Sequence, residues 1–161
     1  MDRPRVTLRE MTEDEYRTYV GEVQAAAAQA LLATMPEEEA REKAAGGIAH
    51  YLPDGVATAN HTLVIAENAE GAPVGNAWLG PDPNRAEGSD GAWLYDINVY
   101  PHARRHGYGA AILAAVEELA VREGKTRIGL NVVGSNEAAI ALYSKSGYAV
   151  SSMQMSKPLV P

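Results

Sequence analysis

The stretch from Ile97 to Leu113 reads INVYPHARRHGYGAAIL and joins two different kinds of segment. Its first residues are an apolar run that favours a strand up to Pro101, and its last residues are apolar at helical spacing. Two arginines, a histidine and two glycines lie between them. Backbone N–H groups at the start of a helix bind anions, and glycines let a ligand approach them. The stretch therefore indicates a phosphate-binding turn whose length suits a pyrophosphate; a tight turn with surface arginines is the alternative.

The composition is that of one globular domain, which we place at residues 1–161. Hydrophobic residues make up 46% of the chain and charged residues 22%, which is ordinary for such a domain. The absence of cysteine excludes disulfides and thiolate chemistry from the protein. No apolar run reaches membrane-spanning length, and the N-terminal residues show no apolar core of a signal peptide. We expect a cytoplasmic protein with no membrane partner.

The net charge of −7 disfavours nucleic acid as a partner, because phosphate backbones require a basic surface. A cationic small molecule or a basic peptide suits it better. Arg104 and Arg105, with His102 and His106 beside them, are a local exception where an anion is expected. The two histidines have the spacing of metal ligands on a helix, but no third ligand stands near them. We interpret them as part of a solvated turn and predict no metal.

Apolar periodicity and turn residues predict the element order βααβββαβαβ. This order describes an α/β (α+β) fold with a mixed, mostly antiparallel sheet and helices on both faces. Thr12 and Glu15 match a capping box, Gly46 and Gly47 are an expected turn, and Gly147 suits the end of the last helix. The predicted strands are 6–9, 61–66, 73–79, 92–99, 127–133 and 148–156, and the predicted helices are 12–33, 37–45, 108–123 and 136–146.

Two other phosphate-binding motifs fail in detail. A dinucleotide-binding fingerprint would need Gly or Ala where Ile112 stands. The triplet from Gly124 to Thr126 looks like the end of a P-loop, but Leu119 occupies the place of the first glycine and the segment before it is helical.

The residues Arg104–Ala110, RRHGYGA, resemble the R/Q-x-x-G-x-G/A signature of the GCN5-related N-acetyltransferase (GNAT) family. The preceding Val99–Pro101 is similar to the strand ending in V-x-P that introduces this signature. A second block, NEAAIALY at 136–143 with the Gly-Tyr pair at 147–148, is similar to the family's N-x-x-A-x-x-L-Y-x-x-x-G-F/Y pattern. The resemblance covers residues 92–156, the expected acetyl-CoA-binding core.

The resemblance implies that the co-substrate acetyl-CoA binds between the strands 92–99 and 127–133, which diverge. It implies that backbone groups of Ile97 and Val99 bond the pantetheine arm as an added strand would, and that Asn136 and Tyr143 lie beside the arm and the sulfur. It also implies that the amides of residues 105–110, which we call the glycine loop, hold the pyrophosphate. The expected cofactor-binding residues are Ile97, Val99, Arg104, Arg105, His106, Gly107, Tyr108, Gly109, Ala110, Asn131, Asn136 and Tyr143.

Acyl transfer to an amine needs a neutral amine, a donor for the thioester oxygen and a proton for the leaving thiolate. The resemblance favours Tyr143 as the acid over a core aromatic, and the Val99 N–H as the oxyanion donor. Many family members have a Glu at about the position of Tyr95, so the base stays open. Asp96 is adjacent, but alternation directs it to the opposite face unless a bulge intervenes. It is a buried structural acceptor or a functional carboxylate; a water-relayed base and capture of neutral amine are alternatives.

We therefore expect an acetyl-CoA-dependent N-acetyltransferase that moves the acetyl group directly to a primary amine of a small molecule or a peptide. The alternative is a non-catalytic acyl-CoA-binding or sensing module of the same fold. The acceptor site is expected from the first two helices, the turn at 53–55 and the loop at 80–91, and the resemblance favours a homodimer. Candidates to line the acceptor site are Tyr16, Tyr19, His50, Tyr51 and Trp78.

Overall fold

The computed structural model describes residues 3–160 of the chain, which forms two compact units, Met1–Asn131 and Val132–Pro161. Residues 1, 2 and 161, which the predicted domain includes, lie outside the described residues. We describe each unit by itself. Within residues 3–160, no helix has both the length and the apolar character needed to cross a membrane. The strands are β1 (Thr7–Glu10), β2 (Thr62–Glu67), β3 (Pro73–Pro81), β4 (Gly91–Val99) and β5 (Arg127–Leu130), and the helices are α1 (Glu13–Leu31), α2 (Glu37–Tyr51), α3 (Tyr108–Arg122) and, in the second unit, α4 (Glu137–Lys145).

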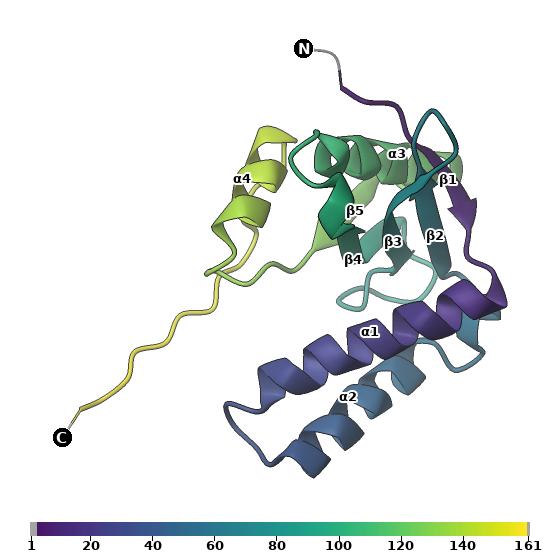
Figure 1. Cartoon of the computed structure of the whole chain (residues 1–161). Coiled ribbons are helices and arrows are strands. Elements are labelled where there is room, and N and C mark those ends of the chain that lie inside the picture. The colour runs from purple at the N-terminus through teal and green to yellow at the C-terminus, as the bar shows by residue number, and fades with distance from the viewer. Residues whose placement is uncertain (1–2, 161) are drawn as a thin grey trace. The chain divides into compact units, whose positions relative to one another are not determined.

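The five strands form one sheet in the order β1-β2-β3-β4-β5. The first four strands are antiparallel neighbours, and β5 lies parallel to β4. A parallel neighbour requires a crossover connection, and α3 supplies it. The pair α1 and α2 covers one face of the sheet, and α3 covers the other (Figure 1). The predicted mixed sheet, mostly antiparallel with helices on both faces, is confirmed.

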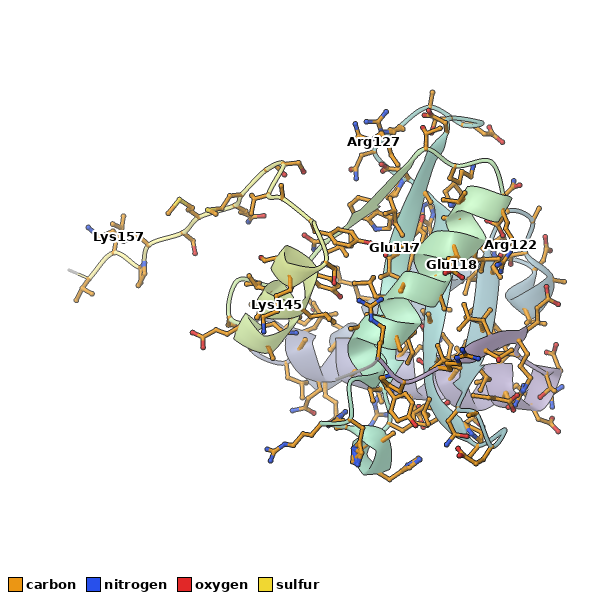
Figure 2. All side chains as sticks on the ribbon, turned by 90° about the horizontal axis from the view of Figure 1, so that it is seen from above. Glu117, Glu118, Arg122, Arg127, Lys145 and Lys157 are labelled. Atoms are coloured by element: carbon orange, nitrogen blue, oxygen red, sulfur yellow. The ribbon has the colours of Figure 1, made fainter. Side chains whose placement is uncertain are left out.

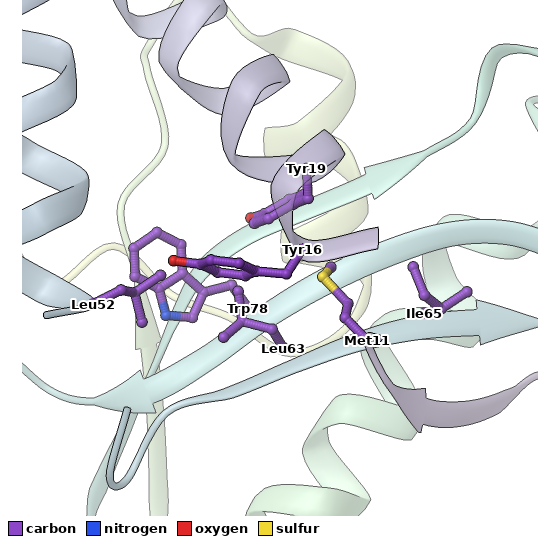
Figure 3. Close-up of a cluster of buried hydrophobic side chains, with 7 residues drawn as sticks. All are labelled: Met11, Tyr16, Tyr19, Leu52, Leu63, Ile65 and Trp78. Atoms are coloured by element: carbon purple, nitrogen blue, oxygen red, sulfur yellow. The ribbon is translucent and has the colours of Figure 1, made fainter. Parts of the chain in front are cut away.

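The face covered by α1 and α2 carries a core rich in aromatic side chains (Figure 3). Alternate residues of β2 and β3 point to this face, and α1 adds tyrosines three residues apart, which share one side of a helix. Each large side chain buried in this way stabilises the fold by roughly 1.5–3 kcal/mol. The buried members are Met11, Tyr16, Tyr19, Leu52, Leu63, Ile65 and Trp78.

A network of hydrogen bonds and ion pairs at the start of α1 connects β1, α1 and β2. Thr12 and Glu15 form the predicted capping box, with Glu15 N donating to Thr12 Oγ1 at 3.2 Å and Thr12 N donating to Glu15 Oε1 at 2.9 Å. Arg9 donates to both Glu15 oxygens and, at 3.0 Å, to Glu67 Oε2. The hydrogen bonds that Glu15 accepts, first those from Arg9 and then that from the backbone of Thr12, lower its pKa to about 2. The entry into α1 is thus fixed against the edge of the sheet.

The prediction of a turn at Gly46 and Gly47 is wrong, because α2 continues through both residues to Tyr51. Glycine costs a helix about 1 kcal/mol relative to alanine, and tertiary packing overrides that cost here. The continued helix brings Ile48 against the core and ends beside the buried Leu52.

The predicted final strand at 148–156 is also wrong: the structure has no strand after β5 among the residues up to 160. The pattern is apolar enough for a strand, but its large apolar side chains are exposed, with Met153 at 70% and Met155 at 84%. A strand exists only where a neighbour completes its hydrogen bonds, and the sheet places none of its ladders there. The strand predicted to end at 133 likewise ends at Leu130.

Two glycines should respond in opposite ways to alanine. A Cβ on Gly75 would clash with the carbonyl oxygen of Asn98 and lie 2.7 Å from Ile112 Cδ1, whereas a Cβ on Gly46 would meet nothing within 4 Å. We expect Gly75→Ala to lower the free energy of unfolding by roughly 1–3 kcal/mol. We expect Gly46→Ala to raise it by about 0.5–1 kcal/mol, since that glycine is helical and exposed. Urea unfolding of both variants measures this, and a tolerated Gly75→Ala would contradict the packing described.

Candidate active site

The strands β4 and β5 pair over only part of their length. Their register runs from Gly91 opposite Arg127 to Leu94 opposite Leu130, and it stops there. Asn131 follows directly. Beyond Leu94, β4 keeps its ladder with β3, but within residues 3–160 no strand pairs with its other edge. The sheet therefore opens between β4 and β5 at the middle of β4, as the family resemblance implied.

The exposed edge of β4 presents the backbone groups of particular residues. Tyr100 N donates to Val74 O at 2.9 Å, so residues at even positions near this end of β4 face β3. Because neighbouring residues of an antiparallel ladder alternate, Ile97 and Val99 direct their N–H and C=O groups to the open edge. Arg104 Nε donates to Val99 O at 3.0 Å. The N–H of Val99 and the C=O of Ile97 are left facing the opening.

A β-bulge at Tyr95 changes which side chains of β4 share a face. Asp96 stands opposite Trp78, but Leu94 stands opposite the next residue, Leu79, so Tyr95 is the extra residue. Tyr95 stacks on Trp78 with ring centroids 4.6 Å apart, and Asp96 bonds to α1. Both side chains therefore face the α1–α2 side. Alternation alone would have put Tyr95 and Asp96 on opposite faces of the sheet.

Asp96 is a half-buried carboxylate with one protein hydroxyl as its donor. Tyr19 of α1 donates its hydroxyl to Asp96 Oδ2 at 2.8 Å. Burial raises the pKa of Asp96, and the bond from Tyr19 and one from the backbone of Ile97 oppose that rise. Burial, followed by the charge of Asp96, raises the pKa of Tyr19 far above its ordinary value. The pair is thus a neutral phenol holding a carboxylate whose proton affinity is increased.

Aromatic rings surround Tyr95 on the α1–α2 side of the bulge. Tyr95 donates its hydroxyl to Pro81 O at 2.7 Å, and the ring of Tyr51 lies 5.2 Å from it. Trp78 Nε1 donates to His61 Nδ1 at 3.0 Å. An indole N–H is only a donor, so this bond makes Nε2 the protonated nitrogen of a neutral His61, and burial lowers the pKa of that histidine. His61 is therefore a donor and is excluded as the base.

Gly80 makes the close packing of these rings possible. A Cβ at that position would lie 2.5 Å from His61 Nδ1 and 2.9 Å from Tyr95 Cε2. No side chain fits there without moving both rings. This ring cluster lies at the end of the sheet where β3 ends and β4 begins, and its close packing requires glycine at position 80.

The glycine loop at the other end of β4 has the backbone of an anion site. After a 3₁₀ turn at Pro101–Ala103, Arg105 has φ +65° and Gly107 has φ +83°. Two left-handed residues so close together turn successive amides to one side. Ala111 N donates to Gly107 O, so the amides at 108–110, in the first turn of α3, have no intrahelical acceptor.

Positive charge is concentrated at this loop. Arg104 and Arg105 are exposed, and His106 Nδ1 lies 2.8 Å from Arg104 O, to which it donates. Farther along α3, Figure 2 shows Glu117 and Glu118 on the helix surface. An anion is therefore favoured at the start of α3 and not along its length.

The second unit holds the two remaining predicted residues. Asn136 is the N-cap of α4, and its side chain accepts from Ala139 N at 3.2 Å. The ring of Tyr143 lies 5.7 Å from that of Tyr148, and Gly147 ends the helix with φ +97°, as predicted. The placement of Asn136 and Tyr143 beside a bound co-substrate stays a prediction.

Most of the residues on the α1–α2 side were predicted from the sequence, but the hydrogen bonds that connect them were not. Tyr16, Tyr19 and Trp78 are buried in the core, whereas Tyr51 is 37% exposed and His50 is exposed. The bond between Tyr19 and Asp96 gave no signal in the sequence. Asn76 was also missed, although a polar residue at an inward position of the apolar run PVGNAWLG is such a signal. Within residues 3–160, no three His, Asp or Glu side chains gather as metal ligands would.

Comparisons with known proteins agree on one family. The sequence model of the acetyltransferase (GNAT) family matches residues 25–148. YdgE of Bacillus subtilis (strain 168), an uncharacterized N-acetyltransferase, is 34% identical over 155 residues, which are 95% of this chain and 98% of YdgE. The crystal structure of YycN from Bacillus subtilis superposes with a TM-score of 0.86 at 27% identity, covering 97% of this chain and 99% of that one.

A more distant structure shares the fold. AAC(6')-Iy, in complex with the bisubstrate analog CoA-S-monomethyl-acetylneamine, superposes with a TM-score of 0.59 at 16% identity, over 97% of this chain and 99% of that one.

Neutralising Asp96 should stabilise the protein near neutral pH. The folded state raises the pKa of Asp96 above its unfolded value, so its contribution is greatest below the unfolded pKa and is lost as the pH rises through the folded pKa. Each unit of the rise corresponds to about 1.4 kcal/mol. We expect Asp96→Asn, which can still accept from Tyr19, to unfold at a higher urea concentration than the wild type at pH 7 and at a similar one at pH 3. An equal difference at both pH values would contradict the burial of this charge.

Proposed function

The chain belongs to the acetyltransferase (GNAT) family, and we propose that it is an acetyl-CoA-dependent N-acetyltransferase acting on a primary amine of a small molecule or a peptide. The observation that carries this proposal is the continuity of the open edge of β4 with the glycine loop. An edge that offers backbone groups at Ile97 and Val99 leads directly into amides that favour an anion. A ligand with an amide-bearing arm attached to a pyrophosphate matches both parts.

Acetyl-CoA supplies an acetyl thioester when it is bound. Ile97 and Val99 are positioned to bond its arm as a neighbouring strand would, and Asn131 stands where β5 turns away. The amides and side chains from Arg104 to Ala110 are suited to the pyrophosphate, because the loop combines left-handed backbone, free amides and positive charge. Asn136 and Tyr143 complete the proposed set from the second unit.

Asp96 is the base in this proposal. The bulge places its carboxylate on the side of α1 and α2, where an acceptor would enter. A base is most effective when its pKa lies close to the working pH, and burial moves the pKa of Asp96 upward from its ordinary value. Tyr19 fixes the carboxylate and leaves Oδ1 to take a proton from the amine.

Two groups meet the remaining requirements: the backbone N–H of Val99 for the oxyanion and the phenol of Tyr143 for the proton on sulfur. The N–H of Val99, which faces the opening, is suited to hold the oxygen that becomes negative when the amine nitrogen bonds to the acetyl carbon. As the carbon–sulfur bond breaks, Tyr143 gives its proton to the thiolate. One proton thus leaves the amine for Asp96 and one reaches the sulfur from Tyr143. Asp96 then releases its proton to water and the Tyr143 phenolate takes one from water, which restores both residues for the next turnover.

The loop can be tested with two nearly isosteric variants. Asn and Asp both tolerate the left-handed conformation of Gly107, but only Asp adds a negative charge beside the amides. We expect acetyl-CoA to bind the wild type at micromolar concentration in calorimetry, to bind Gly107→Asn several-fold more weakly, and to show no measurable binding to Gly107→Asp. Equal affinity of the two variants would show that the pyrophosphate lies elsewhere, and absence of binding to the wild type would refute the proposed function.

Tyr143→Phe separates an enzyme from a non-catalytic acyl-CoA-binding module. Removing the phenol oxygen removes the proposed acid but keeps the ring, so we expect kcat to fall by roughly 10²-fold or more while the dissociation constant of acetyl-CoA changes little. Thiol release with a panel of primary amines measures the rate. Thr18→Ala, which removes an exposed hydroxyl of α1, is the control. An unchanged kcat would rule out Tyr143 as the acid, and a wild type that binds acetyl-CoA without turnover would favour the binding module.

A further inference from the structure

Asn76 is a buried polar side chain whose oxygen has no partner within the protein. The residue lies in β3 with 3% of its surface exposed. Its Oδ1 is the buried side-chain atom without a hydrogen bond among residues 3–160. Leaving such an atom unpaired is costly, whereas an apolar residue of the same shape would cost little. The position therefore calls for a donor that is not one of the protein's own groups.

The sheet places Asn76 beside the proposed base. Asn76 stands directly opposite Asn98, and the next pair on the same face is Trp78 opposite Asp96. Asn76 and Asp96 are thus diagonal neighbours, about 7–8 Å apart at Cα in a regular sheet, a separation that one water molecule can bridge. The bulge adds Tyr95 to this face, because Tyr95 is the extra residue between the pairs Trp78–Asp96 and Leu79–Leu94.

The amide of Asn76 has a defined direction. Its Nδ2 donates to the hydroxyl of Tyr100 at 3.5 Å, and Tyr100 lies opposite Val74, at the end of this row of residues away from Asp96. The nitrogen and oxygen of a planar amide diverge from Cγ. An amide whose nitrogen points to Tyr100 therefore directs its oxygen away from Tyr100, and Asp96 lies on the side of Asn76 away from Tyr100.

We propose that Asn76 is a positioning residue: its Oδ1 holds a buried water molecule that donates its other hydrogen to the carboxylate of Asp96. Asn98, on the same face, supplies a further polar group, so the water has the two to four partners that buried waters take. Tyr19 and this water then approach the carboxylate from two sides. The inference rests on the proposed function only for its catalytic role: if Asp96 is the base, the water keeps this buried carboxylate ionised before the amine arrives.

Other charged groups around this polar row do not account for the effect. Those that face it are Tyr16, Tyr19, Glu15 and Glu22 from α1, Arg9 from β1, and Tyr95 and Tyr100 from β4 and its end, with His61 beside Trp78. Tyr100 loses the bond from Asn76 Nδ2 in an Asn76 variant, but it lies at the end of the row away from Asp96, and the other groups keep their partners. A difference between the wild type and an Asn76 variant therefore reports the substitution itself.

The test is the titration of Asp96 in the free protein, followed by carbon-13 NMR of its carboxyl carbon. Leu has nearly the volume of Asn but cannot hold a water, and Val, smaller and favoured in strands, guards against overpacking by Leu. We expect the midpoint for Asp96 to rise by about one pH unit in Asn76→Leu and Asn76→Val, because a hydrogen bond to the charged form is lost. We also expect both variants to unfold at a temperature equal to or above that of the wild type.

The matched control is Leu79→Val, a truncation in the same strand that faces α3. It should lower the unfolding temperature and leave the Asp96 midpoint in place. An unchanged midpoint in both Asn76 variants, or loss of folding in both, would overturn the proposal and make Asn76 a structural residue. The measurement uses no acetyl-CoA and no amine, so it stands or falls separately from the catalytic activity. If turnover is found, the rising limb of kcat/KM against pH should move upward by the same amount in the Asn76 variants.

Discussion

The single extra residue at Tyr95 decides which side chains of β4 face α1 and α2. A regular β4 would send Tyr95 and Asp96 to opposite faces of the sheet. The bulge turns both toward α1 and α2, where Tyr95 closes the aromatic cluster and Asp96 meets Tyr19. The same kink falls where β5 has left the sheet. One local irregularity thus places a carboxylate, an open backbone edge and an aromatic wall within one region of the structure.

The two ends of β4 are specialised in opposite ways. Its beginning is surrounded by rings packed so closely that Gly80 has no room for a side chain. Its end leads into exposed amides and arginines with left-handed backbone. An anion is favoured at one end and an apolar or cationic group at the other, and the acidic net charge of the chain is consistent with a cationic acceptor. The direction in which two substrates would meet follows from this polarity.

The sequence predicted those parts of the fold that depend on local pattern. The capping box at Thr12, the helix that starts after Gly107 and the strands predicted at 61–66 and 73–79 all follow from residue types at fixed spacing. It could not predict what depends on a partner. The bulge is a mismatch between two strands, which neither strand shows alone. Gly46 and Gly47 look like a turn until the packing of α2 is known, and the segment after α4 looks like a strand although no ladder receives it.

The helices α1 and α2 enter the sheet as an insertion whose ends are joined. Glu10 stands opposite Val64, and Met11 N donates to Leu63 O at 3.0 Å, so the chain leaves and re-enters the sheet at neighbouring points. The entropy of closing such an excursion grows only slowly with its length, and the register of the strands does not depend on what lies between them. The part of this excursion between Val23 and Ile48, beyond the residues that form the aromatic core, can therefore change in sequence and length while the strand that carries Asp96 and the glycine loop stays as it is. The strands and the glycine loop are thus separate from the segment of the chain that can vary.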